Sequence, residues 1–128
     1  MVGSAIESIL SGVGARVSAG RIPHRRGAQH IVYSQISVVP HNDKDGASTY
    51  DKYRFQLDIY ASNYTSCDTL AASVRSALDD YSGTSESVVI DRIYFDGEFD
   101  ATEFEFGPDG SREDYFRRTH DYIIYVRP

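Results

Sequence analysis

The chain of 128 residues is poor in cysteine and has no long apolar run. Its single cysteine, Cys67, has no partner within the chain for a disulfide bond. No continuous apolar stretch approaches the roughly 20 residues of a membrane-spanning helix, and no charged start leads into an apolar run as in a signal peptide. We therefore expect a soluble protein that is made in a reducing cytoplasm, folds without a disulfide or a metal, and has no membrane as a partner.

Positive charge is also scarce. Thirteen Lys and Arg residues stand against 19 Asp and Glu residues, so the formal net charge is -6. Nonspecific binding to nucleic acid depends on Lys and Arg neutralising phosphates, and this balance argues against it. The length suits one domain, because globular domains usually contain about 100–200 residues. Since no repeat, linker or low-complexity tract divides the chain, we expect a single domain over residues 1–128.

Few residues are arranged for catalysis or metal binding. Cys67 falls in the first turn of a predicted helix, where the helix dipole would lower its pKa, but no neighbouring base completes a nucleophile. The histidines, His24, His30, His41 and His120, lack the i, i+4 spacing of a zinc site. We expect a small buried or half-buried thiol, assign no catalytic residue, cofactor or metal, and do not expect an enzyme.

A two-residue period predicts several strands. In YRFQLDIYAS (53–62) one face carries Tyr53, Phe55, Leu57 and Ile59, and the other carries Arg54, Gln56, Asp58 and Tyr60. This alternation indicates an antiparallel strand with one buried face and one wet face. The β-branched segment 31–39 predicts its hairpin partner. The polar segment 40–50 between them is predicted to be a long loop.

A second hairpin is predicted after residue 86. Its first strand, 87–100, places Ile90, Arg92 and Tyr94 on one face and Val89, Asp91, Ile93 and Phe95 on the other. Segment 102–106 either continues that strand or forms a short one of its own, and GPDG (107–110) is a turn signal. The closing strand, 115–128, sets Tyr122, Ile124 and Val126 opposite Asp121, Ile123 and Tyr125.

Apolar spacing and capping residues predict two helices. The first spans Ser4 to Val17, with Ser4 and Glu7 as a capping box and an end between Val13 and Ala19. The second begins at a capping box of Thr65 and Asp68 and ends at Gly83. Its apolar stripe is Leu70, Ala71, Val74, Leu78 and Tyr81. The expected fold is α+β: an antiparallel, possibly mixed sheet of about four strands with two helices packed on it, in the order helix, hairpin, helix, hairpin.

Charge is segregated along the chain. The segment before the first strand is basic, with Arg16, Arg21, His24, Arg25, Arg26 and His30. The last hairpin is acidic, with Asp96, Glu98, Asp100, Glu103, Glu105, Asp109, Glu113 and Asp114. In a monomer such runs are solvated loops, whereas in a ring of identical subunits they suit a head-to-tail interface. The candidate interface residues are Arg16, Arg21, Arg25, Arg26, His41, Asp43, Lys44 and Asp45.

Three segments together carry a resemblance to a known family. HIVYSQIS (30–37), YRFQLDIYASNYTSCDTLAASVRSAL (53–78) and THDYIIYV (119–126) are similar to the tail completion or tail terminator proteins of long-tailed bacteriophages. Gln56, Asp58 and Tyr60 match the second strand of that pattern, and Asp121 and Tyr122 match the last. The chain departs from the pattern at His30, where the family often has proline before the strand.

The resemblance implies a structural virion protein of the phage neck. Such proteins form a homo-hexameric ring at the head-proximal end of the tail tube, stop tube polymerisation and join the tail to the head connector. The implied partners are the protein itself, the tail tube protein and a head completion or connector protein. DNA would pass through the channel without specific binding. We expect Asp96, Glu98, Asp100, Glu103 and Glu105 to line or border that channel, and the loop His41–Ser48 to order only on assembly.

Two other classes of function remain open on the sequence. A small α+β enzyme or ligand-binding domain would place a site between helices and sheet, although no triad, metal cluster or phosphate loop supports one. A nucleic-acid module of the RRM kind would need a basic sheet with exposed aromatic residues in a motif such as RGFGFV. The acidic balance and the missing motif argue against that module.

Overall fold

The computed structural model describes residues 2–20, 29–42, 48–106 and 112–127, with only the backbone described at positions 41–42, 48–49, 101–106 and 112–115. Within these residues the fold consists of two helices, one short 3-10 helix and six strands. In chain order they are α1 (Val2–Ile9), η1 (Leu10–Gly12), β1 (Arg16–Ala19), β2 (His30–Asn42), β3 (Ser48–Ala61), α2 (Tyr64–Leu78), β4 (Gly83–Ser85), β5 (Val88–Phe106) and β6 (Arg112–Val126).

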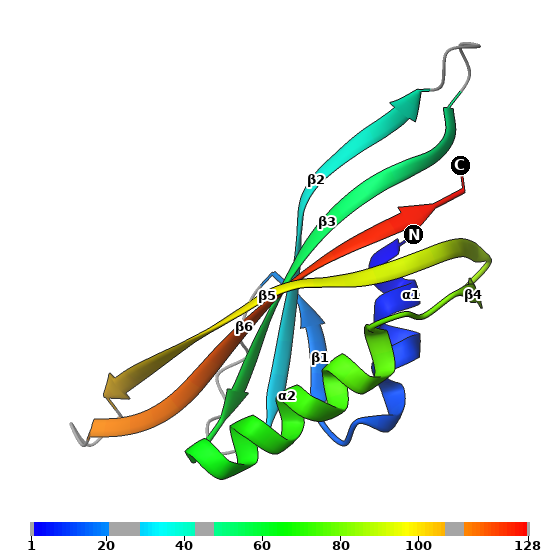
Figure 1. Cartoon of the computed structure of the whole chain (residues 1–128). Helices are drawn as coiled ribbons and strands as arrows, with labels where there is room; N and C mark the ends of the chain where they lie inside the picture. The colour runs from blue at the N-terminus through cyan, green and yellow to red at the C-terminus, as the bar shows by residue number, and fades with distance from the viewer. Residues whose placement is uncertain (1, 21–28, 43–47, 107–111, 128) are drawn as a thin grey trace.

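All six strands form one mixed sheet in the order β1-β2-β3-β6-β5-β4. Only β1 and β2 are parallel, and every other neighbouring pair is antiparallel. The sheet twists and curls strongly, so that the β2–β3 hairpin and the β5–β6 hairpin extend toward opposite ends of the molecule (Figure 1). We call these the upper and lower hairpins.

The expected sheet of about four strands with two helices packed on it is wrong. The protein is mostly sheet, with six strands and two short helices. The two unforeseen strands, β1 and β4, have only four and three residues. Segments this short cannot display a two-residue period, so they are recognised only from their pairing with β2 and β5.

One hydrophobic core joins the helices to the sheet. Its fully buried members come from both helices and from the central strands, and they include Ile6, Leu10, Phe55, Leu57, Ile59, Val74, Ile93, Tyr122 and Ile124. The alternation predicted for β3 is confirmed, because Phe55, Leu57 and Ile59 are buried while Arg54 and Gln56 on the other face are half-exposed. The same holds for β6, where Tyr122, Ile124 and Val126 are buried.

Two β-bulges change the faces predicted for β5. The register with β6 shifts between Ile90 and Arg92 and again between Phe95 and Gly97. Each bulge adds one residue to β5, so side chains that follow it move to the other face of the sheet. Ile90 and Ile93 are therefore both buried, and the prediction that Ile90 shares a face with Arg92 is wrong.

The N-terminal helix is shorter than predicted. It begins at Val2, before the expected capping box of Ser4 and Glu7, and a 3-10 turn then ends at Gly12. Gly14 adopts φ 82°, a left-handed conformation that breaks a helix, and the chain continues as β1. The segment expected to be helical up to Val17 is thus divided between helix and strand.

The second helix is confirmed, with different ends. Its N-cap is Asn63, whose side chain accepts a hydrogen bond from the Ser66 amide at 2.8 Å, in place of the predicted Thr65. Leu70, Ala71, Val74 and Leu78 are buried as expected. The helix ends at Leu78, so Tyr81 packs against the core from the following loop.

The loop predicted for residues 40–50 includes residues that belong to strands in the structure. β2 and β3 continue their ladder through Pro40 with Asp51, His41 with Tyr50 and Asn42 with Ser48. The polar side chains of this region suggested a loop, but backbone pairing does not require apolar residues. Segment 102–106 continues β5, one of the two alternatives foreseen. The GPDG turn lies outside the described residues.

Candidate functional site

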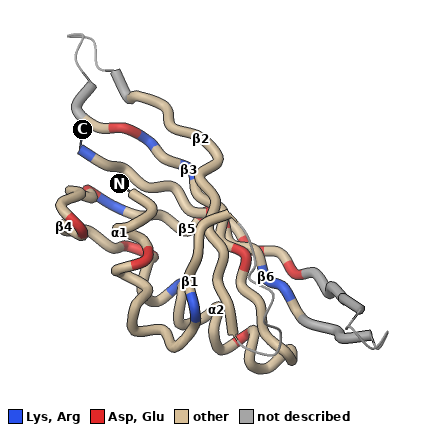
Figure 2. Tube along the Cα trace, turned by 180° about the vertical axis from the view of Figure 1, so that it is seen from behind, with Lys and Arg blue, Asp and Glu red and all other residues tan. Residues whose placement is uncertain are grey.

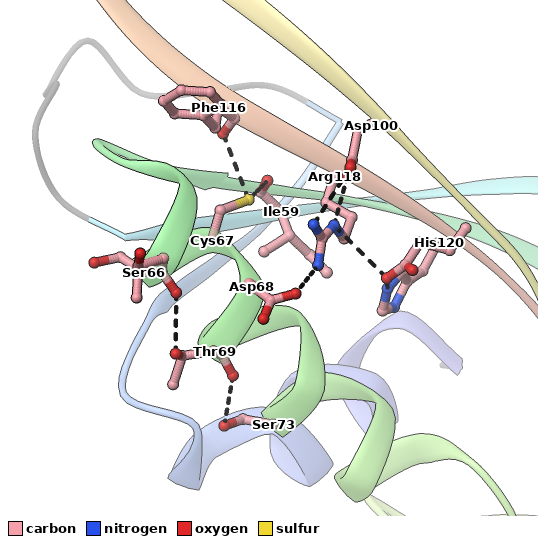
Figure 3. Close-up of polar contacts among 12 residues, drawn as sticks. Ile59, Ser66, Cys67, Asp68, Thr69, Ser73, Asp100, Phe116, Arg118 and His120 are labelled. Carbon is pink, nitrogen blue, oxygen red and sulfur yellow. Dashed lines mark hydrogen bonds and ion pairs between the residues drawn. The ribbon is translucent and has the colours of Figure 1, made fainter.

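A buried arginine holds the base of the lower hairpin against α2. Arg118 of β6 is only 5% exposed. Its Nη1 donates to Asp68 Oδ1 at 2.6 Å, which ties β6 to the first turns of α2. Its Nε donates to Asp100 Oδ1 on β5 and lies 3.7 Å from Glu98 Oε1 (Figure 3). We call Asp68, Glu98, Asp100, Arg118 and His120 the hairpin-base cluster.

Electrostatics strongly favour the charged form of this arginine. The hydrogen bond to Asp100, followed by that to Asp68 and the nearby charges, outweighs desolvation and raises the pKa of Arg118. The cluster contains three carboxylates for one guanidinium. Because the carboxylates of Asp68, Glu98 and Asp100 remain about half exposed, water can hydrate the excess negative charge.

His120 extends the cluster into the core. The ring is 0% exposed, with Nε2 at 2.8 Å from Glu98 Oε1 and Nδ1 at 2.9 Å from the Tyr122 hydroxyl. A neutral imidazole satisfies both contacts if Nε2–H donates to Glu98 and the Tyr122 hydroxyl donates to Nδ1. Burial lowers the pKa of His120 more than the Glu98 carboxylate raises it, and Arg118 and Arg75 lower it further. The folded protein therefore holds the ring neutral.

This lowered pKa predicts a loss of stability in mild acid. In the unfolded chain His120 titrates near 6.5, so below that pH protons bind preferentially to the unfolded state. The contribution is fully present well above pH 6.5 and is lost as the pH falls through 6.5, by up to about 1.4 kcal/mol per pH unit where the unfolded ring is protonated and the folded ring is not. Urea unfolding at pH 7.0, 6.0 and 5.5 measures the slope, with His120→Gln as the comparison. Equal slopes in the two proteins would contradict the assignment, since His30 contributes equally to both.

Cys67 lies on the inner side of α2, next to the cluster. Its thiol is buried and donates to the Ile59 carbonyl at 3.5 Å (Figure 3). Burial raises the pKa of Cys67, so the lowering expected from the helix dipole is wrong. The prediction of a small buried thiol is confirmed.

The acids predicted to border a channel do not share one face. Glu98 and Asp100 point to the helix side, where they contact His120 and Arg118. Asp96 stands at the second bulge and pairs with Arg54 at 3.0 Å, on the face opposite the core residue Phe55. Glu103 and Glu105 lie on β5, but their side chains are outside the described part. Figure 2 shows positive and negative segments close together along β5 and β6.

Most of the predicted interface residues lie outside the part of the chain that the structure describes. Arg21, Arg25, Arg26, Asp43, Lys44 and Asp45 are in undescribed segments, as is most of the loop His41–Ser48. His41 is on β2, with only its backbone described. Arg16 is exposed at the start of β1, paired in register with His30.

Exposed apolar side chains gather on the upper hairpin. On β2, Ile36 and Val39 are each 53% exposed and Val38 is 40% exposed. An open groove of about 750 Å³ lies between this hairpin, the start of α1 and the start of β5. Tyr33, Val38, Tyr53 and Val88 contribute to its mainly apolar wall. Within the described residues, no group of His, Cys, Asp and Glu is placed to hold a metal ion.

The sequence did contain a signal for the hairpin-base cluster. Arg118 and His120 have the same parity as Tyr122, Ile124 and Val126, which the sequence placed together on one face of this strand and which the structure buries. Polar residues on a buried face require partners. The partners were not predictable, because Asp68 and Asp100 are 50 and 18 residues away from Arg118 in the sequence.

These features define a small, mostly β protein with a curled mixed sheet and two diverging hairpins, and comparisons with known proteins identify its family. The family "Tail completion protein gp17" matches residues 3–126, so the chain belongs to this family. It is a structural protein of a phage virion, located at the tail or neck. The resemblance found in the sequence is thereby confirmed.

Solved structures show the same fold. One chain of the virion of a native gene transfer agent particle is similar with a TM-score of 0.62 and 16% identity, covering 94% of this chain and 84% of that chain. A second solved chain, whose name indicates no activity, is similar with a TM-score of 0.56 and 14% identity over 99% of this chain and 95% of that chain. No curated protein matches the sequence. Neither helix in the described part of the chain is long and apolar enough to cross a membrane.

Proposed function

We propose that this protein closes the head-proximal end of the phage tail tube. Six copies form a ring that stops tube polymerisation and joins the tail to the head connector. The observation that carries the proposal is the match to the tail completion family over nearly the whole chain. The fold suits this role, because its two long hairpins reach in opposite directions and offer separate contact surfaces (Figure 1).

The hairpins provide surfaces of different character. The upper hairpin carries the exposed Ile36, Val38 and Val39, which suit contact with another protein surface. The lower hairpin is acidic and anchored by Arg118. We assign the border of the channel to the segment from Asp96 to Asp114, where negative charge would let DNA pass without specific binding. Asp96 would belong to the uncovered sheet face.

Deletion of the gene from its source genome tests the proposal. After induction, electron microscopy of the lysate should show filled heads beside unjoined tails of irregular length. Complementation in trans with the wild-type gene should restore joined particles with tails of uniform length, which controls for effects on neighbouring genes. Normal joined particles from the deletion strain would refute the terminator role.

A further inference from the structure

In the described chain, the short outer strands β1 and β4 leave long parts of β2 and β5 without a strand partner on one side. β1 pairs with β2 only over His30–Tyr33, so within the described residues β2 has no strand partner on that side from Ser34 to Asn42. β4 pairs with β5 only over Val88–Ile90. An open edge presents unpaired amides and carbonyls that can pair with another chain.

The α2–β4 connection covers a further part of the β5 edge. The Ile93 amide donates to the Tyr81 carbonyl at 3.0 Å, and the Ile93 carbonyl accepts from the Asp80 amide at 2.9 Å. The Phe95 amide donates to the Asp79 carboxylate at 3.2 Å. In the described chain the open part of β5 therefore begins after the second bulge, at Gly97, and continues to Phe106.

Hydrogen bonds and bulges show which amides of β2 point to the open edge. The Tyr33 carbonyl accepts from the Gly20 amide at 2.9 Å, so Tyr33 faces the edge, and so does Gln35 two residues on. The bulge at Ile36 moves this alternation by one residue, which places Val38 and Pro40 at the edge. Pro40 has no amide hydrogen, and an edge is where a strand tolerates proline.

The same reasoning applies to β5. Ile93 and Phe95 face the edge, because their amides bond to Tyr81 and Asp79. After the bulge at Asp96 the alternation moves by one residue, so the amides of Glu98, Asp100 and Thr102 face the edge. Their side chains do not occupy it, since Glu98 and Asp100 contact His120 and Arg118 on the helix face.

The two open edges are compatible as partners. In the order β2, β3, β6, β5 every neighbouring pair is antiparallel, so β2 and β5 also run in opposite directions. A copy related by rotation within a ring keeps these directions, and its β5 would meet β2 as an antiparallel neighbour. The segment 34–40 has no charged residue, so it places no like charge against the acids of β5.

The open edges can meet in a curved, closed wall. Val38 lies in the row of Ile124, and the edge residues Glu98 and Asp100 lie in the rows of His120 and Arg118, four and six residues further along β6. Pairing Val38 with Glu98 or with Asp100 would offset the sheets by about 13 or about 20 Å along the strands, over a step of four strands, or about 19 Å, across them. These offsets give strand tilts of about 35° or about 45°, the usual range for closed barrels.

We propose that the open β2 edge, from Ser34 to Val39, pairs antiparallel with the open β5 edge of the next copy, from Gly97 onward. The pairing would join the sheets of adjacent copies into one continuous wall. It rests on the ring of the proposed function and names the backbone surface that closes it.

Hydrogen exchange followed by mass spectrometry or NMR tests the pairing directly. The unmodified protein is compared as a dilute monomer and as a ring assembled on purified tail tubes. The amides of Gln35, Val38, Glu98, Asp100 and Thr102 should exchange at least about 100-fold more slowly in the ring. A ring that leaves these amides as exposed as in the monomer overturns the pairing and leaves the terminator role standing. Failure of the unmodified chain to form a ring on tubes overturns both.

A proline at Val38 provides the matched variant. Val38→Pro removes an amide hydrogen that points to the open edge. It keeps the hydrogen bonds between β2 and β3, because the Val38 amide does not point toward β3. Val38→Thr keeps that amide and the β-branched shape. Val38→Pro should unfold at the same temperature as Val38→Thr as a monomer but require at least ten times the concentration to form rings. Rings formed by both variants at the wild-type concentration would overturn the proposal.

Discussion

Replacing Arg118 with methionine is expected to destabilise the folded protein by about 3 kcal/mol. The change removes hydrogen bonds between a buried guanidinium and the carboxylates of Asp68 and Asp100, and bonds to charged groups contribute about 1.5–3 kcal/mol each. It also leaves three carboxylates near one another without a cation. Their partial exposure allows hydration and keeps the loss at the lower end of the range for a broken buried ion pair.

The matched control is Arg92→Met. Arg92 also forms an ion pair, with Asp80 at 3.4 Å, but both side chains are exposed. Such surface pairs contribute about 0–1 kcal/mol, so this variant should unfold within about 1 kcal/mol of the wild type. Urea unfolding followed by circular dichroism measures both. A similar loss in the two variants would show that the hairpin-base cluster does not anchor the lower hairpin.

The periodicity of the sequence was sufficient to predict the long central strands and α2. Phe55, Leu57 and Ile59 alternate with polar residues without interruption, and α2 repeats its apolar residues at helical spacing. The faces of β5 were mispredicted because a bulge is an insertion relative to the partner strand and leaves no trace in a single strand's pattern. β1 was missed because Val17 continued a helical stripe that Gly14 interrupts in the structure.

The candidate site was less predictable than the fold. The acids of the last hairpin were read as one surface, but the bulge at Asp96 separates Asp96 from Glu98 and Asp100 on opposite faces. Their neutralisation by Arg54 and Arg118 depends on contacts between distant segments. The open edges of β2 and β5 follow from the lengths of β1 and β4, which only the pairing reveals.

Phe55→Ala should be the most destabilising single change among the core residues discussed, with a loss of about 4 kcal/mol. The ring is 0% exposed, and truncating a buried phenylalanine to alanine usually costs about 3–5 kcal/mol through lost burial and the remaining cavity. Phe55 lies beside Tyr33 and Tyr53, with ring centroids at 6.3 and 6.2 Å, so these rings also lose contacts. Val39→Ala, at an exposed position, is the control and should remain within about 0.5 kcal/mol.

The position of Phe55 also predicts how unfolding proceeds. In the sheet it pairs with Gln35 of β2 on one side and with Tyr122 of β6 on the other, so it joins the upper hairpin to the lower one. Both hairpins therefore depend on the same packed residues, and Phe55→Ala should lower the stability of both together. Urea unfolding of this variant should remain one transition, with tyrosine fluorescence and far-UV circular dichroism giving the same midpoint. Separate midpoints would show that the hairpins are stabilised independently. A loss of stability no larger than that of Val39→Ala would show that Phe55 does not contribute to the core as its burial indicates.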